Sequence, residues 1–331
     1  MSPSGHKRVF DEEVLVDLTQ FPDRIADTFA GKTVLVTGAT GFVGRALVER
    51  ILHNTDVKKV YILIKSKRGK GTQERFAHYF DSCFFDPLKK ERPESLKRVE
   101  AIQGDLSELE IGISREDRRK LIDEVNIIYH SGASVRFDEY IKKMIMLNVR
   151  GTRNMIALAK EVKNLQLFVH VSTTYCQPRN VVLNEDVSIT PHNPHDMIRI
   201  AENMDEGTLN ILTSKLVGDY GNTYTFSKAL AEAIVFEQMD KLPILVVRPS
   251  IVMPCIKHPI PGFTDSEYGP MSLWILYCKG MLRVTKVKPE YVLDYVTLDM
   301  VINTLLITTY NYINNTEKKY RYATRRTSNG P

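Results

Sequence analysis

The chain has 331 residues, 43% of them hydrophobic, which is enough for one large α/β domain or for a domain with a smaller lobe. Its formal net charge is +5, from 45 basic and 40 acidic residues, and this mild excess gives no indication of a nucleic-acid partner. The four cysteines include no CxxC pair, so we expect reduced intracellular thiols, with neither disulfides nor a metal site.

The start of the chain lacks the uninterrupted apolar run of a signal peptide, and we expect residues 1–30 to form an N-terminal arm. Elsewhere no stretch approaches the ~20 apolar residues that a membrane-spanning helix requires. The longest apolar candidates, at 272–277 and 301–310, are too short and lie close to charged residues. The sequence therefore predicts a chain without a transmembrane helix.

A glycine-rich turn joins the first predicted strand to the first predicted helix. Residues 34–36 form a short apolar run typical of a buried strand, and apolar residues recur at helical spacing over 46–52. Glycines at the spacing found between them allow a tight turn, close approach to a pyrophosphate and close helix packing, while the helix N-terminus offers unpaired N–H groups. A tight connection without a ligand would have the same pattern. The predicted cofactor contacts in this turn are Gly38, Thr40, Gly41, Phe42, Val43 and Gly44.

Cations follow the second predicted strand, residues 59–64, at Lys65, Lys67, Arg68 and Lys70. A carboxylate at this position usually binds the ribose 2′-hydroxyl of NAD, whereas basic residues suit the 2′-phosphate of NADP. The sequence therefore predicts NADPH as the cofactor, with Lys65 and Arg68 in contact with the phosphate. The alternative is an ordinary solvated basic loop.

Three further strands are predicted at 99–104, 126–130 and 165–171, each followed by small or polar residues. Five strands that alternate with helices predict a doubly wound parallel sheet, in which ligands bind beyond the carboxyl ends of the strands. Gly132, at one of these ends, allows close approach of a ligand. His130 is more typical of a satisfied structural histidine than of a catalyst.

A Tyr-x-x-x-Lys pair stands at the start of a predicted helix, after the loop-rich, proline-containing stretch 174–222. The i, i+4 spacing places Tyr224 and Lys228 on one face, about 5–6 Å apart at Cβ. A cation at that range is expected to lower the phenol pKa, so that Tyr224 acts as a general acid towards an oxygen whose carbon receives hydride. Ser172 or Thr173, at the end of the fifth strand, can polarise the same carbonyl. A surface pair on a helix would show the same spacing.

Several segments resemble the alcohol-forming fatty acyl-CoA reductases of plants and animals, in the extended branch of the short-chain dehydrogenase/reductase superfamily. They are TGATGFVG, GDL, HSGASVRFD, NVRGT, HVSTTYCQP, NTYTFSKALAE and VVRPSIV, and the resemblance runs over about 29–312. It implies a Rossmann-type doubly wound sheet over 31–313, with a smaller substrate lobe from late insertions at about 174–222 and 252–298. Residues 314–331 are expected to form a polar tail, and the C-terminal domain usual in the family is expected to be absent.

The resemblance also implies roles for the site residues. Tyr224 and Lys228 carry catalysis, and Thr173 is favoured over Ser172 as the second hydroxyl. Asp105 contacts the adenine in the extended dehydrogenases, although an aspartate here also suits the cap of a turn. The other residues expected to frame the dinucleotide are Leu106, Gly132, Pro249, Ser250 and Val252.

The implied reaction is the NADPH-dependent reduction of a long-chain fatty acyl-CoA to a primary fatty alcohol through the aldehyde, a step of lipid and wax synthesis. The family acts at the cytosolic face of peroxisome or endoplasmic reticulum membranes, and the basic residues at 318–326 would favour peripheral association with anionic lipid. Apolar residues at 271–276 are candidates for the wall of an acyl-chain pocket, although core packing explains them equally well.

Two other functions fit parts of the same pattern. A sugar-nucleotide epimerase or dehydratase of the extended branch would share the glycine turn, Tyr224 and Lys228. The long separation of Thr173 from Tyr224 and the cations after the second strand favour the reductase over it. A catalytically silent NADP-binding protein is the second alternative, and the presence of the Tyr/Lys pair weighs against it.

Overall fold

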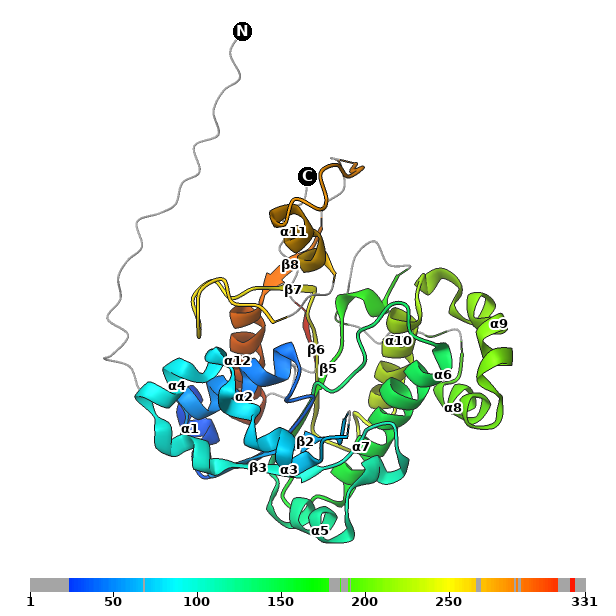
Figure 1. Ribbon diagram of the computed structural model, residues 1–331. Coiled ribbons are helices and arrows are strands. Elements are labelled where there is room, and N and C mark those ends of the chain that lie inside the picture. The colour runs from blue at the N-terminus through cyan, green and yellow to red at the C-terminus, as the bar shows by residue number, and fades with distance from the viewer. Residues whose placement is uncertain are drawn as a thin grey trace.

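The computed structural model describes residues 24–67, 69–178, 185, 190, 192–265, 269–288, 290, 293–314 and 322–324. Within these residues, seven parallel strands form the main sheet in the order β3-β2-β1-β4-β5-β6-β9 (Figure 1). The strands are β1 (Thr33–Thr37), β2 (Lys59–Ile64), β3 (Val99–Gln103), β4 (Ile127–His130), β5 (Leu167–Val171), β6 (Ile244–Arg248) and β9 (Tyr322–Thr324). The order 3-2-1-4-5-6 is that of doubly wound dinucleotide-binding folds, which confirms the predicted fold class.

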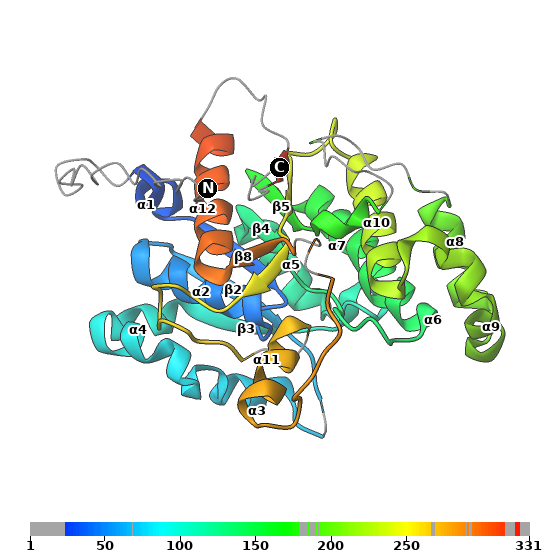
Figure 2. The same ribbon diagram turned by 90° about the horizontal axis from the view of Figure 1, so that it is seen from above.

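Helices cover both faces of the sheet (Figures 1 and 2). They are α1 (Arg24–Phe29), α2 (Phe42–Asn54), α3 (Thr72–Ala77), α4 (Asp86–Glu91), α5 (Arg115–Glu124), α6 (Ile141–Met144), α7 (Gly151–Glu161), α8 (Pro194–Asn203), α9 (Glu206–Val217), α10 (Thr223–Phe236), α11 (Pro270–Cys278) and α12 (Leu298–Asn314). Val34 and Val36 of β1 pack with α2 and α12, whereas Leu35 between them packs with α5 and α7. The strand is therefore buried throughout, as a parallel strand between two helical layers must be.

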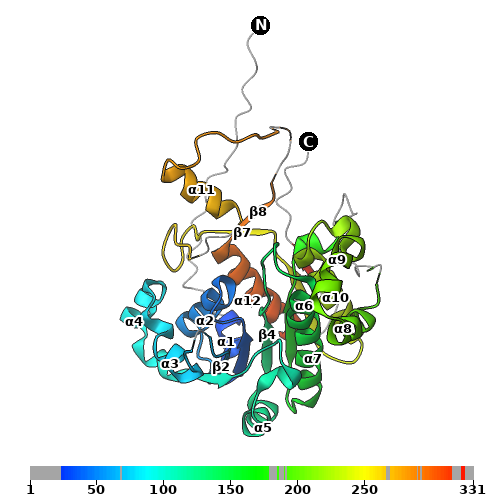
Figure 3. The same ribbon diagram turned by 45° about the vertical axis from the view of Figure 1, so that its right-hand side comes forward.

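A third apolar cluster holds a helical lobe beside the sheet, where α8 and α9 pack near α6 and α10 (Figure 3). The prediction that residues 174–222 are rich in loops is wrong where the chain forms the helices α8 and α9. Pro194 stands in the first turn of α8, where a missing N–H removes no helical bond. Asn193 and Asp205 then cap α8 and α9 by accepting bonds from backbone N–H groups. Pro194 and these two polar residues start helices instead of preventing them.

The second late insertion forms a small parallel sheet of two strands, β7 (Ile251–Met253) and β8 (Tyr295–Thr297), with α11 between them in the chain. At the ends of the chain, α1 is the last part of the expected arm, and 1–23 lie outside the described residues. β9 falls within 314–331, the expected polar tail, and pairs with β6. Among the described helices, none is both long and apolar enough to cross a membrane.

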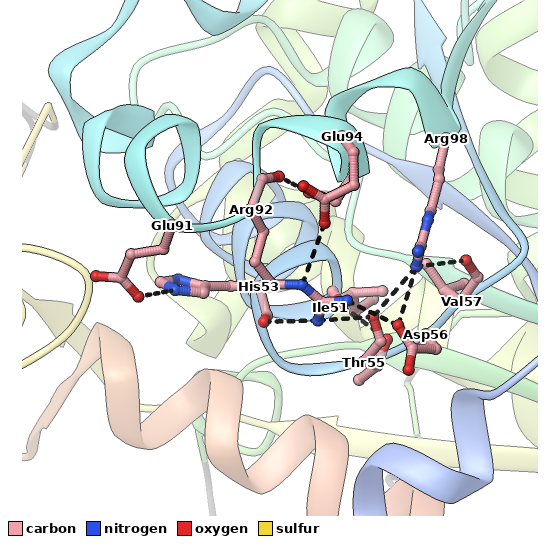
Figure 4. Close-up of polar contacts among 10 residues, drawn as sticks. Ile51, His53, Thr55, Asp56, Val57, Glu91, Arg92, Glu94 and Arg98 are labelled. Atoms are coloured by element: carbon pink, nitrogen blue, oxygen red, sulfur yellow. Dashed lines mark hydrogen bonds and ion pairs between the residues drawn. The ribbon is translucent and has the colours of Figure 1, made fainter.

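Two arginines satisfy carbonyl groups at the C-terminal end of α2 (Figure 4). Arg92 donates to the backbone oxygens of His53 at 3.0 Å and Thr55 at 3.3 Å, and Arg98 donates to that of Val57 at 3.2 Å. Cations suit this position because the last carbonyls of a helix lack partners and form the negative end of its dipole. These bonds fasten α2, whose other end begins at the glycine turn, to the segment that leads into β3.

The strand register brings the predicted binding segments to one edge of the sheet. Thr37 lies opposite His130, and Val171 lies opposite Val247, so four strands end at one level. The segments that follow them therefore run along the carboxyl edge, where doubly wound sheets bind their ligands.

Gly44 is expected to tolerate no side chain. An added Cβ would lie 2.7 Å from the carbonyl carbon of Gly38, so Gly44→Ala forces α2 away from β1. Overpacking of this kind costs about 1–3 kcal/mol, and we expect that loss in the free energy of unfolding measured by urea titration. Gly71→Ala is the control, because nothing lies within 4 Å of its added Cβ and its φ of −70° suits alanine. Equal losses in the two variants would contradict the packing role of Gly44.

Candidate active site

The glycine turn after β1 lies directly against the end of β4. Gly38 has a φ of +72°, a conformation that favours glycine, and a Cβ on it would lie 2.7 Å from backbone atoms of Gly132. Thr37 ties the two strand ends together. Its hydroxyl oxygen accepts from the Gly132 N–H at 3.1 Å, and its carbonyl accepts from the Ser131 hydroxyl at 2.7 Å. The result, which we call the glycine floor (Gly38 and Gly132), is bare backbone that a phosphate can approach closely.

α2 begins at the glycine floor. Its N-cap is Gly41, which has no side chain to accept from the first N–H groups of the helix. The positive end of the helix dipole, at residues 42–44, therefore lies next to the glycine floor. Arg45 donates to the backbone oxygen of Thr40 at 3.3 Å and is ion-paired with Asp265 of the second insertion. The predicted phosphate contacts of this turn thus lie together, next to a substrate-side segment.

Lys65, the expected contact of a 2′-phosphate, lies beside Asp105 at the ends of β2 and β3, with Nζ and Oδ2 3.2 Å apart. Burial opposes ionisation of Asp105, but hydrogen bonds from Ser107 and the Lys65 charge outweigh it and lower the pKa of Asp105 below its usual value. Arg75 of α3, which sequence reasoning missed, donates to the backbone oxygen of Lys65 and adds a second cation. Arg68 lies outside the described residues.

Asp105 also caps the turn after β3. Its Oδ1 accepts from the Ser107 N–H at 2.9 Å and from the Ser107 hydroxyl at 2.7 Å, so the capping role considered for this residue is present. Leu106 is buried beneath the glycine floor, since a Cβ on Gly132 would lie 2.6 Å from its Cδ1. Leu106 therefore supports the backbone that faces the ligand.

The residues after β6 adjoin the segment after β5. The carbonyl of Pro249 accepts from the Thr174 N–H at 3.0 Å, and Ser250 is buried. Val252 lies in β7, opposite Val296 of β8. Two of the three expected cofactor contacts of this region thus stand at the edge of the main sheet, and the third begins the second insertion.

Tyr224 and Lys228 stand in the first two turns of α10, which packs against the end of β5. Asn222 starts the helix by accepting from the Thr225 N–H at 2.9 Å. Lys228 is only 4% exposed, and its ammonium group donates to the Val171 carbonyl at 2.7 Å. The start of α10 thus places the catalytic pair predicted from the sequence at the carboxyl edge.

The two candidate hydroxyls after β5 have different neighbours. The Thr173 hydroxyl lies near enough to the phenol of Tyr224 to affect its pKa, whereas Ser172 is buried beside the thiol of Cys176. The geometry therefore favours Thr173 as the second hydroxyl at a reacting oxygen. On its other side the Tyr224 ring stacks with Phe137 at a centroid distance of 5.6 Å, a contact that sequence reasoning missed.

Burial controls the pKa values of the pair. It raises the pKa of Tyr224 to about 12, against an opposing effect of the Thr173 hydroxyl. The prediction of a lowered pKa for Tyr224 is therefore wrong, because the net shift is upward. Burial also lowers the pKa of Lys228 to about 8, although the charge of Glu232 opposes the shift. Desolvation is thus the largest cause of both shifts.

A buried ion pair lies behind Lys228. Glu232, one turn further along α10, is 0% exposed and accepts from Arg248 of β6, which is 1% exposed. The Nη2–Oε1 distance is 2.6 Å and the Nε–Oε2 distance is 3.1 Å, a two-pronged geometry. The Cys176 thiol also donates to Glu232, at 3.3 Å. Sequence reasoning missed this pair, because the four-residue step from Tyr224 through Lys228 places Glu232 on the same helix face and does not identify Arg248 as its partner.

His130 joins three elements next to the glycine floor. Its Nδ1 lies 2.8 Å from the Thr37 hydroxyl of β1, and its Nε2 lies 3.0 Å from the Thr152 hydroxyl of α7. Burial lowers the pKa of His130 to about 3, so the ring is neutral, with one nitrogen donating and the other accepting. A neutral histidine with two partners fits the structural role expected for it.

Comparison with known proteins identifies the family. The family model described as male sterility protein, an NAD-binding domain, matches residues 36–305. The chain belongs to this family. Its curated relatives include Fatty acyl-CoA reductase 1 of Xenopus laevis, 41% identical over 85% of this chain and 55% of that protein. The human protein of the same name is 40% identical over 84% of this chain and 54% of its own length. The matches confirm the predicted resemblance, and the chain spans about half the length of these relatives.

Solved structures show that this chain shares its fold with reductase domains. The terminal R domain of the myxalamid PKS-NRPS pathway aligns with a TM-score of 0.65 at 24% identity, over 89% of this chain and 65% of that one. The reductase domain of a nonribosomal peptide synthetase from Mycobacterium tuberculosis aligns with a TM-score of 0.64 at 23% identity, over 93% and 72%. These likenesses establish the fold.

The buried pair behind Lys228 is expected to be sensitive to the loss of one partner. Glu232→Gln removes the carboxylate that accepts from the buried Arg248, and removing one partner of a buried ion pair costs about 3–5 kcal/mol. We expect a loss of that size in urea unfolding. Glu161→Gln is the control, because Glu161 and Arg118 form a more exposed pair whose loss costs less than about 1 kcal/mol. Similar losses in the two variants would show that the Glu232 charge is unimportant for folding.

Proposed function

We propose that this chain reduces a long-chain fatty acyl-CoA to the primary alcohol, through the aldehyde, with NADPH as the reductant. The observation that carries the proposal is the placement of Thr173, Tyr224 and Lys228 at the carboxyl edge that also holds the glycine floor. The reductase names of its curated relatives support the substrate class. We further propose that it acts at the cytosolic face of peroxisome or endoplasmic reticulum membranes.

The residues at the carboxyl edge suit a dinucleotide. Gly38 packs backbone to backbone against Gly132, so no side chain at Gly38 separates the two strand ends, and the N-terminus of α2 suits the pyrophosphate. Lys65 and Arg75 offer cations for a 2′-phosphate, which supports NADPH over NADH. When bound, NADPH supplies hydride to the carbonyl carbon of the substrate.

Tyr224 acts as the proton donor in this proposal. A phenol with a pKa of about 12 keeps its proton at neutral pH, so it is ready to protonate an oxygen on which negative charge develops. Thr173 stabilises the same oxygen by a hydrogen bond that strengthens with the charge. Lys228, which is charged below a pH of about 8, stabilises the phenolate left after proton transfer.

The same residues serve both reductions. The first gives a hemithioacetal, which collapses because a thiolate, from a thiol of pKa near ~8.5, is a tolerable leaving group. The resulting aldehyde presents another carbonyl oxygen to Thr173 and Tyr224. The alkyl chain has no polar group to recognise, so its binding depends on apolar burial at ~0.8 kcal/mol for each CH₂.

The reaction is tested by supplying the chain with NADPH and acyl-CoA of increasing length, and by identifying the products with gas chromatography. We expect two NADPH consumed for each alcohol formed, and tighter binding of longer chains until the pocket ends. Accumulation of aldehyde, with one NADPH consumed for each molecule formed, would mean that the chain catalyses only the first reduction. Turnover of a nucleotide sugar without turnover of any acyl-CoA would instead indicate an epimerase.

Tyr224→Phe is expected to bind NADPH normally and to lose turnover, because the substitution removes the proton donor and keeps the ring. Removing a positioned general acid lowers kcat by about 10²–10⁴-fold. Tyr310→Phe is the control. Tyr310 lies in α12 on the other side of the sheet and is not a residue of the proposed site, so this substitution should leave kcat unchanged. Near wild-type kcat in Tyr224→Phe would mean that the proton comes from another group.

Lys65→Ala is expected to weaken NADPH and to leave NADH unchanged, since only NADPH carries the 2′-phosphate. A charge-assisted hydrogen bond contributes about 1.5–3 kcal/mol, so the loss should be about 10-fold or more in the dissociation constant. Fluorescence titration with both cofactors measures it, and Lys89→Ala in α4 is the charge-matched control. Equal dissociation constants for NADPH and NADH in the unmodified chain would refute the cofactor assignment.

A further inference from the structure

α11 and the residues after it project from the body of the molecule. In Figures 1 and 3 this projecting segment, defined as residues 269–288, lies beyond β7 and β8 and stands clear of the helices that cover the main sheet. No residue of α11 is buried. The segment therefore presents its side chains outward from the part of the chain that the structure describes.

The projecting segment exposes large apolar side chains. Trp274 is 58% exposed, Met281 is 72% exposed and Val284 is 83% exposed, and Leu273, Tyr277 and Val287 are exposed as well. A helix that is apolar on all sides is normally covered by a core or by lipid. Exposed apolar groups gathered on one projection therefore indicate a surface that meets another apolar phase.

Positive charge accompanies these apolar side chains. Lys279, Arg283, Lys286 and Lys288 are all exposed, and residues 269–288 include no aspartate or glutamate. An acyl-CoA, which carries both an alkyl chain and phosphates, would also match both kinds of side chain, but a pocket that held it would cover the segment, whereas no residue of α11 is buried. An anionic bilayer accounts for both, because apolar side chains enter the interface while lysine and arginine contact the headgroups.

We propose that the projecting segment is a membrane-docking element that places Trp274, Met281 and Val284 in the interface of an anionic bilayer, with its cations on the headgroups. This docking does not depend on the proposed reaction, since it requires neither substrate nor cofactor. It differs from association through the basic residues at 318–326, because it combines apolar insertion with charge.

The tryptophan of the projecting segment reports on the proposal directly, because Trp274 is the single tryptophan of the chain. The chain is mixed with vesicles of phosphatidylcholine alone or of phosphatidylcholine with phosphatidylserine. We expect a blue shift of Trp274 emission, and quenching by lipids brominated on the acyl chain, with the anionic vesicles. Equal responses to both vesicles, or no response to either, would overturn the proposal.

Two double variants separate the apolar and charged contributions, and vesicle co-sedimentation measures their effect. Met281→Asp/Val284→Asp and Lys286→Glu/Lys288→Glu should each weaken binding by at least ~10-fold, because each reverses a favourable contribution at the interface. Ile211→Asp/Lys215→Glu is the matched control on α9, where Ile211 is 81% exposed, and it should bind as the unmodified chain does. Melting temperatures of all three confirm that they are folded.

Three further outcomes decide against the proposal. Full binding in both projecting-segment variants would assign membrane binding to another part of the chain. A blue shift produced by acyl-CoA in solution, without any response to vesicles, would make the segment a wall of the substrate pocket. Emission that shifts with protein concentration alone would indicate a second copy of the chain as the partner.

Discussion

Two backbones approach closely where β1 and β4 end, and the candidate site depends on this approach. Gly38 and Gly132 have no side chains to hold them apart, so Thr37 bonds the Gly132 amide and His130 reaches Thr37 from the neighbouring strand. A larger residue at either glycine would separate the strand ends and displace the start of α2. The surface offered to a phosphate is thus a product of sheet geometry more than of any side chain.

α10 connects this surface to the helical lobe and carries three ionisable side chains in successive turns. Tyr224 contacts Thr173, Lys228 reaches the end of β5, and Glu232 is fixed by Arg248. Because Lys228 and Glu232 are buried and Tyr224 is partly buried, the protonation of each depends on its neighbours. Burial raises the pKa of the Tyr224 phenol further above neutrality, while Glu232 favours the charged form of Lys228 against the cost of desolvation. A neutral donor beside a cation is the arrangement that general-acid chemistry requires.

Local signals predict most of the fold and part of the site. Buried β-branched runs and the glycine spacing over 38–44 depend on neighbours in sequence, and β1 to β5 form where they were predicted. Arg75 with Lys65, and Glu232 with Arg248, join separate elements, and no local pattern specifies such partners. The direction of the Tyr224 pKa escapes prediction for the same reason, because burial is a property of the whole fold. The helices α8 and α9 were not predicted because, in a sequence, a proline at the start of a helix looks the same as a proline in a loop.

The ion pair between Lys65 and Asp105 bears on any attempt to redesign this chain for a different dinucleotide. Placing a carboxylate at position 65, the usual single exchange, would set two negative charges where the ends of β2 and β3 now hold a balanced pair. Asp105 has little freedom to turn away, because Ser107 holds its other oxygen. The proposed preference for NADPH therefore involves residues of two neighbouring strands, and a redesign that places a carboxylate at position 65 would need a compensating change at Asp105.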